Sequence, residues 1–144
     1  MSAAKGLVLF PGAGSSASHS SLIALEEAMQ PLPVARVDFP YRRAGKRAPD
    51  RAPVLLQCVR EEVQAFAKAS GVRTSSLVVG GRSMGGRMCS MAAAGDTGLA
   101  KKGEQALQDI VEHVNQVSEL MDGMDTDTSS RVVKNLVSRK INEI

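Results

Sequence analysis

The residues that most clearly suggest chemistry are Gly81, Ser83 and Gly85, in the segment GRSMG. This G-x-S-x-G spacing is the nucleophile-elbow pattern, in which a serine on a sharp strand-to-helix turn attacks an acyl carbon. The turn strains the serine backbone, and side chains two positions before and after it would collide with the strand and the helix, so glycine is expected at both. The backbone N–H of Met84, at the positive end of the next helix, would face the oxyanion that forms on the substrate.

A second oxyanion donor usually comes from the loop after an earlier strand. The segment FPGAGSS offers the backbone N–H groups of Ala13 and Gly14, beside glycines that let a backbone come close to a ligand. We therefore predict an oxyanion loop at Gly12–Gly14. The alternatives are a flexible glycine-rich turn for this loop and a solvent-facing serine without chemistry at Ser83.

An alternation of strands and helices must bring these residues together. Apolar runs predict strands at 6–10, 34–40 and 76–81, and helical patterns cover 21–30, 52–71 and 84–95. Ser20 or Ser21 is the expected N-cap of the first helix and Gly71 the expected C-cap of the second. This order is typical of a parallel sheet with right-handed crossovers. We predict an α/β fold: a truncated, three-stranded parallel core.

The pattern changes after Asp96. Residues 95–104 are polar and contain glycine, which is typical of a boundary, and from Leu107 onward apolar residues step by three and four in a heptad. We predict two parts: a partial domain over residues 1–96, and an α-helical tail over 97–144 that forms a hairpin or coiled-coil segment and supports self-association.

Three longer segments carry a family resemblance: LFPGAGSSASHSSL (9–22), VARVDFPYRRAGKRAPDRAP (34–53) and VVGGRSMGGRM (78–88). Together they resemble the α/β-hydrolase superfamily. The combination is similar to a small dienelactone-hydrolase-like branch, which shares its domain with a subunit of the nonspecific-lethal chromatin complex and a testis-expressed relative. The resemblance covers about residues 5–96. It implies a serine hydrolase for a small ester, thioester or related acyl substrate, with Ser83 as nucleophile.

The resemblance also suggests which residues surround the site. His19 lines up with a histidine that the family keeps in the early loop and that is not the triad base. The arginine-rich loop from Arg42 to Arg51 would lie near the mouth of the site. We therefore name His19, Arg42, Arg43 and Arg82 as candidates for the substrate mouth.

The chain departs from the family after the elbow helix, where an acid and then a histidine should complete the triad. The only later histidine, His113, falls at a g position of the heptad, and Asp122, Asp125 and Asp127 lie in an acidic linker. A serine without its histidine loses roughly four to six orders of magnitude in rate. We predict a chain that is inactive or weakly active alone, and one account of it is a truncated or fused reading frame with a foreign tail.

Two other function classes stay open. One is a non-catalytic pseudo-hydrolase that serves as an interaction module. The other is a dinucleotide-binding domain, since GAGSSA (12–17) fits G-x-G-x-x-A and Asp38 ends the second strand. Against the latter, the segment SSASHSS delays the helix, so a pyrophosphate would not rest on its N-terminus.

Composition argues against a membrane-spanning, nucleic-acid-binding or metal-binding protein. A 43% apolar content supports a real core, and no apolar run approaches the roughly 18 residues of a membrane span. The basic loop has no nucleic-acid motif around it, and the net charge of the whole chain is only +3. Cys58 and Cys89 lack metal-ligand spacing and are expected to be buried in a cytoplasmic, reduced protein. We predict no cofactor, no metal and no nucleic acid. Residues 104–121 are loosely similar to chemoreceptor signalling helices.

Overall fold

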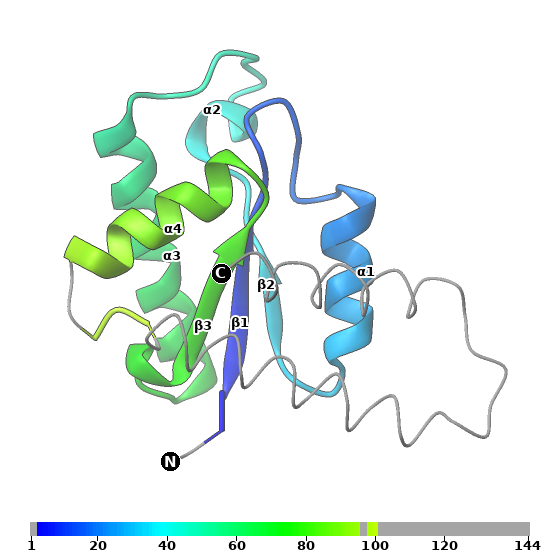
Figure 1. The fold of residues 1–144 in the computed structure, drawn as a ribbon, viewed down its shortest axis with the longest axis vertical. Coiled ribbons are helices and arrows are strands. Elements are labelled where there is room, and N and C mark those ends of the chain that lie inside the picture. The colour runs from blue at the N-terminus through cyan, green and yellow to red at the C-terminus, as the bar shows by residue number, and fades with distance from the viewer. Residues whose placement is uncertain (1–2, 96–97, 101–144) are drawn as a thin grey trace, which may run out of the picture.

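The computed structural model describes residues 3–95 and 98–100. In chain order the elements are β1 (Gly6–Phe10), α1 (Ser20–Met29), β2 (Val34–Arg36), α2 (Pro40–Arg43), α3 (Ala52–Ser70), the short 3-10 turn η1 (Thr74–Ser76), β3 (Leu77–Gly81) and α4 (Met84–Gly95). The predicted α/β order is confirmed (Figure 1). The predicted tail, including its heptad and His113, lies outside the described residues apart from the turn at 98–100.

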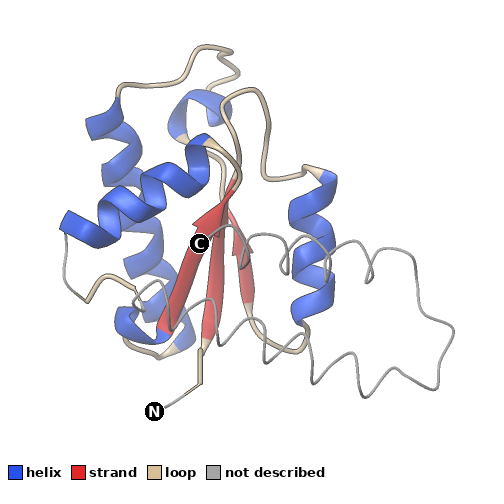
Figure 2. Cartoon of the chain, in the orientation of Figure 1, coloured by secondary structure: helices blue, strands red, loops and turns tan. Residues whose placement is uncertain are grey.

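The sheet is small and wholly parallel, with strand order β2-β1-β3. Phe10 is the register partner of Gly81, so β1 and β3 end side by side at their carboxyl edge. Helix α1 covers one face of the sheet, and α3 and α4 cover the other (Figures 1 and 2). This arrangement brings the loop after β1 and the turn after β3 to the same edge, as expected for a parallel sheet.

The two faces of the sheet build two apolar clusters. Val8 and Phe10 of β1 pack with α3 and α4, whereas Leu7 and Leu9 pack with α1, as the period-2 alternation of a strand requires. All five residues of β1 are buried because the strand is central and both of its faces are covered. The larger cluster contains the aromatic pair Phe10–Phe39, whose ring centroids are 5.2 Å apart.

Of three local predictions, two are wrong in detail and one is confirmed. The second strand ends at Arg36 instead of residue 40, because Pro40 begins the short helix α2, where its missing N–H costs nothing. His19, not a serine, is the N-cap of α1: its Nδ1 accepts the N–H of Ser21 at 3.1 Å. The C-cap at Gly71 is confirmed, with a left-handed φ of 69°.

Residues 98–100 return the chain to the amino end of β3. Thr74 Oγ1 donates to the carbonyl of Gly98 at 2.7 Å, and Leu99 is buried in the larger cluster. Among the helices of the described ranges, none has the length and apolar character needed to cross a lipid bilayer.

Candidate functional site

Ser83 occupies the turn between β3 and α4 in a strained backbone conformation. Its φ is +47°, the only positive φ of a residue other than glycine in the described part of the chain. Such a conformation costs roughly 1–3 kcal/mol and persists only where the surroundings fix it. They do so here: the Arg82 N–H donates to the Phe10 carbonyl at 3.1 Å, and the Arg87 N–H donates to the Ser83 carbonyl at 3.0 Å. Ser83 is exposed, and α4 begins at the next residue.

The glycines around Ser83 are required by the end of β1. A Cβ on Gly81 would lie 2.0 Å from the Phe10 carbonyl oxygen, and a Cβ on Gly85 would lie 2.4 Å from the same atom. A Cβ on Gly86 would lie 2.8 Å from the Gly81 carbonyl oxygen. Gly81 and Gly85 are the two glycines predicted from the sequence, but a Cβ on either would collide with the neighbouring strand β1, not with β3 and α4 as predicted. The requirement for glycine at position 86 is not predicted from the sequence.

The predicted oxyanion loop lies directly against the Ser83 turn. A Cβ built on Gly12 would be 3.6 Å from the Cβ of Ser83, an ordinary van der Waals contact. Gly12 is buried, Ala13 is half-buried and Gly14 is exposed. The structure therefore brings the segment Gly12–Gly14 and Ser83 together at the carboxyl edge of the sheet.

Side chains from β2 and the segment after it hold this loop. The Tyr41 hydroxyl donates to the Ala13 carbonyl at 2.8 Å, and Asp38 Oδ1 accepts the Ala17 N–H at 2.7 Å. Arg36 donates from one guanidinium nitrogen to the Ala17 carbonyl at 2.6 Å and pairs with Glu26 of α1 through Nε. Asp38, which the dinucleotide hypothesis needed for a ribose, thus holds the loop backbone.

Arg82 and His19 meet beside the Ser83 turn. Arg82 donates from one terminal nitrogen to Ser21 Oγ at 3.1 Å, and the same nitrogen lies 2.9 Å from His19 Nε2. His19 Nδ1 is already an acceptor for the Ser21 N–H. Within the described residues, the Ser83 hydroxyl makes no hydrogen bond, so neither His19 nor any carboxylate there contacts it as a base.

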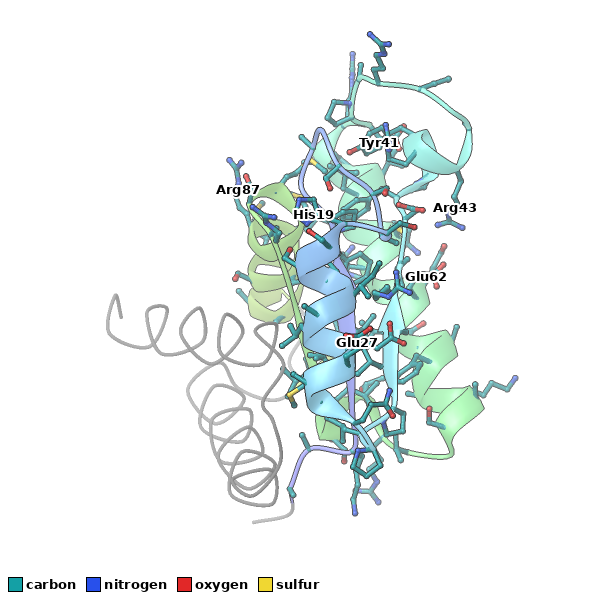
Figure 3. The ribbon with its side chains drawn as sticks, turned by 90° about the vertical axis from the view of Figure 1, so that its right-hand side faces the viewer. His19, Glu27, Tyr41, Arg43, Glu62 and Arg87 are labelled. Carbon is teal, nitrogen blue, oxygen red and sulfur yellow. The ribbon has the colours of Figure 1, made fainter. Side chains whose placement is uncertain are left out.

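The charge around the start of α4 is positive. Arg82 and Arg87 are exposed, and the first turn of α4 carries no acidic residue. Figure 3 shows Arg87 and His19 on the same side of the molecule. Because a helix N-terminus is itself electropositive, the two arginines are unfavourable for the helix but suit a developing negative charge near Ser83.

Arg43 lies elsewhere. Its Nε donates to the Asp38 carbonyl at 3.0 Å, and one terminal nitrogen lies 3.4 Å from Cys58 Sγ and 3.5 Å from Glu62 of α3. Figure 3 shows Arg43 and Glu62 together, on the side away from Arg87. None of these contacts is with Ser83 or its loop. Arg42 belongs to the same short helix α2.

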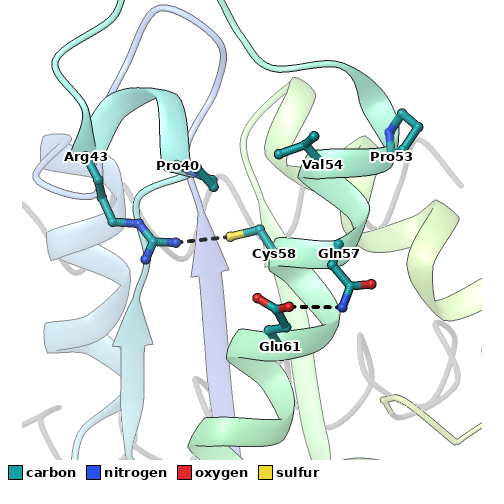
Figure 4. A pocket seen from close by; sticks show the side chains of 7 residues that line it. All are labelled: Pro40, Arg43, Pro53, Val54, Gln57, Cys58 and Glu61. Atoms are coloured by element: carbon teal, nitrogen blue, oxygen red, sulfur yellow. Dashed lines mark hydrogen bonds between the residues drawn. The ribbon is translucent and has the colours of Figure 1, made fainter.

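A cavity of about 320 Å³ lies beside Arg43, between α2 and α3 (Figure 4). The residues that line it are Pro40, Arg43, Pro53, Val54, Gln57, Cys58 and Glu61. Neither Ser83 nor the predicted oxyanion loop lines this cavity, so it is separate from the site at Ser83.

The two cysteines are buried free thiols, as expected. Burial raises the pKa of Cys58, although the Arg43 guanidinium partly opposes this. Burial raises the pKa of Cys89 to about 12, and its thiol donates to the Gly80 carbonyl at 3.6 Å. Across the described ranges, no group of three or more histidine, cysteine or acidic side chains is arranged to hold a metal ion.

Comparisons with known proteins give one result. A family model described as an alpha/beta hydrolase domain matches residues 3–109, a range that contains every predicted site residue. The comparisons with curated proteins and with solved structures give no match.

Proposed function

We propose, from the premise that this chain belongs to the alpha/beta hydrolase domain family, that it is a serine hydrolase-like protein with Ser83 as its nucleophile. The observation that carries the proposal is the backbone of Ser83: φ +47° at the exposed end of β3, between two glycines that cannot hold a Cβ. Strain of this kind concentrates at functional sites. A serine that served only as a surface residue would gain nothing from this conformation.

The reaction proposed is acyl transfer from a small ester, thioester or related substrate. Ser83 Oγ would attack the acyl carbon, and the carbonyl oxygen would take the negative charge. The N–H of Met84 makes no hydrogen bond to a described group, and neither do those of Ala13 and Gly14. These are the donors that we assign to the oxyanion, each worth about 10²–10³ in rate in a preorganised hole.

The proton of Ser83 has no acceptor among the described residues. Removing the histidine from such a site costs roughly four to six orders of magnitude. We therefore propose that the chain alone is inactive or weakly active, and that an added base restores part of the reactivity. The second candidate function, a non-catalytic interaction module, is favoured by this same unpartnered hydroxyl.

Further parts of the proposal rest on the resemblance and on the sequence. We assign the chain to the dienelactone-hydrolase-like branch, on the blocks DFPY, PDRAP and GGRSMGGRM in this order. We propose a cytoplasmic protein, on the two free thiols. We propose self-association through a helical tail at residues 97–144, on the heptad that begins at Leu107.

The test is covalent labelling of the full chain with a fluorophosphonate, with and without imidazole as an external base. We expect one phosphonyl group per chain, mapped to Ser83 by peptide mass spectrometry, and faster labelling with imidazole. Ser83→Ala should abolish the adduct. Ser90→Ala is the matched control, because Ser90 is exposed on α4, the helix that follows Ser83, and donates to the Gly86 carbonyl at 3.1 Å. An unmodified Ser83 in folded protein with imidazole would leave only the non-catalytic function.

A further inference from the structure

Hydrogen bonds to the carbonyl oxygens orient the peptide groups of the Gly12–Gly14 segment. The Gly12 carbonyl accepts the Ser15 N–H at 3.1 Å, and the Ala13 carbonyl accepts the Tyr41 hydroxyl at 2.8 Å. In a planar trans peptide the C=O and the N–H point in opposite directions. The N–H of Gly14 shares its peptide with the Ala13 carbonyl, so it points away from Tyr41.

The hydroxyl of Tyr41 is held firmly enough to fix that direction. The ring is 1% exposed and stacks on Phe39 at a centroid distance of 6.4 Å, and Phe39 packs against Phe10. The Tyr41 N–H is bound by Asp50 Oδ2 at 2.9 Å. Phe10 connects Tyr41 to the Ser83 turn, because its ring packs against Phe39 and its carbonyl accepts the Arg82 N–H.

We propose that Tyr41 is a positioning residue for the oxyanion site, which aims the Gly14 N–H at the substrate oxygen by holding the Ala13 carbonyl. This inference rests on the proposed function, and it assigns the second donor to Gly14 in particular. Tyr41 itself touches no reacting atom. Burial raises the pKa of Tyr41, so its hydroxyl keeps the donated proton at neutral and mildly alkaline pH.

The consequence is a specific kinetic signature. Without the hydroxyl, the Ala13–Gly14 peptide is free to rotate, and the donor is lost or misplaced by an ångström or so. Misplacement of this order costs about 10- to 100-fold in the rate of the chemical step. Noncovalent binding of a small reagent does not depend on that donor. A general loosening of the fold would instead lower thermal stability and affect binding and reaction together.

The experiment measures labelling of Ser83 by a fluorophosphonate in the full chain with imidazole, resolved into KI for reversible binding and kinact for the covalent step. Tyr41→Phe keeps the ring stacking and is expected to lower kinact by about 10- to 100-fold with KI unchanged. Replacement of Tyr41 by 4-aminophenylalanine, which restores an N–H donor, should recover most of kinact. Thr74→Val is the matched control: it also removes a hydroxyl bound to a backbone carbonyl, but at the other end of β3.

The outcomes separate the inference from the proposed function. If the wild type labels at Ser83 and Tyr41→Phe labels equally fast, the positioning role is overturned and the nucleophile stands. If the wild type does not label, both are overturned. Should Tyr41→Phe show no cooperative thermal transition, replacement of Tyr41 by 4-fluorophenylalanine takes its place, because it keeps the ring and fills the para position but has no proton to donate to the Ala13 carbonyl. A lower kinact at constant KI then supports the inference, and an unchanged kinact overturns it.

Discussion

Ser83 and Cys58 are two nucleophilic side chains in opposite situations. Cys58 has the more nucleophilic atom, an arginine 3.4 Å away and a cavity of about 320 Å³ beside it, but it is 3% exposed and burial raises its pKa. The Ser83 hydroxyl makes no hydrogen bond within the described residues, yet Ser83 is exposed on a strained turn beside the N–H groups of Ala13, Gly14 and Met84, which bind no described group. Backbone placement and access thus distinguish Ser83, the nucleophile that we propose, from the intrinsically more nucleophilic Cys58.

The largest effect is expected at Gly81. Gly81→Ala places a Cβ 2.0 Å from the Phe10 carbonyl oxygen, and neither backbone can yield without separating β1 from β3. We expect a loss of about 3–5 kcal/mol in the free energy of unfolding, measured by urea denaturation. Gly80→Ala is the control, since a Cβ there meets nothing within 4 Å, and it should change stability by less than about 1 kcal/mol. Equal losses at the two positions would contradict the packing described for the turn.

The pH dependence of stability tests whether a buried thiol is held in its protonated form, and Cys89 is the clearer case of the two cysteines. The pKa of Cys89 is raised to about 12 in the folded state, so the unfolded thiol ionises first as the pH rises. The contribution of Cys89 is therefore complete below about pH 9 and is lost between about pH 9 and 12, with a slope of up to about 1.4 kcal/mol per pH unit. We expect the free energy of unfolding of Cys89→Ala to fall less steeply than that of the wild type over this range. Parallel curves would show that the thiol is not buried as described.

A smaller effect is expected from relief of strain at Ser83. Ser83→Gly and Ser83→Ala both remove the hydroxyl, but only glycine adopts a φ of +47° without a Cβ penalty. We expect Ser83→Gly to be more stable than Ser83→Ala by about 1 kcal/mol, compared by thermal and urea unfolding. If the alanine variant is as stable as the glycine variant, the backbone of the turn is not strained.

The sequence predicts the Ser83 turn because its pattern is local. Five consecutive residues define the elbow, and short apolar runs define the strands of the central sheet. The reason that Gly81 and Gly85 must be glycine is not local, because it depends on the register that sets the carbonyl of Phe10 opposite them. The residues of GRSMG alone do not indicate how β1 and β3 are paired.

Two kinds of feature could not be predicted from the sequence. One is a contact between residues that are far apart in the chain, and the other is a side chain that takes a role expected of a different residue type. Tyr41 and Ala13 are 28 positions apart, and only the folded chain brings the hydroxyl to the carbonyl. His19 takes the N-cap role expected of a serine, because a neutral imidazole nitrogen accepts a hydrogen bond as a hydroxyl does. The contacts of Arg43 with Glu62 and Cys58 also join residues that are far apart in the sequence, and its place at the substrate mouth stays a prediction.

The central claim is that the fold makes the hydroxyl at position 83 more reactive than any other in the chain. The most direct measurement compares the sites of fluorophosphonate adducts in the native chain and in the chain unfolded in urea, both with imidazole. The account predicts a single adduct at Ser83 in the native chain and loss of that selectivity on unfolding. The same distribution of adducts over serines in both samples would contradict it.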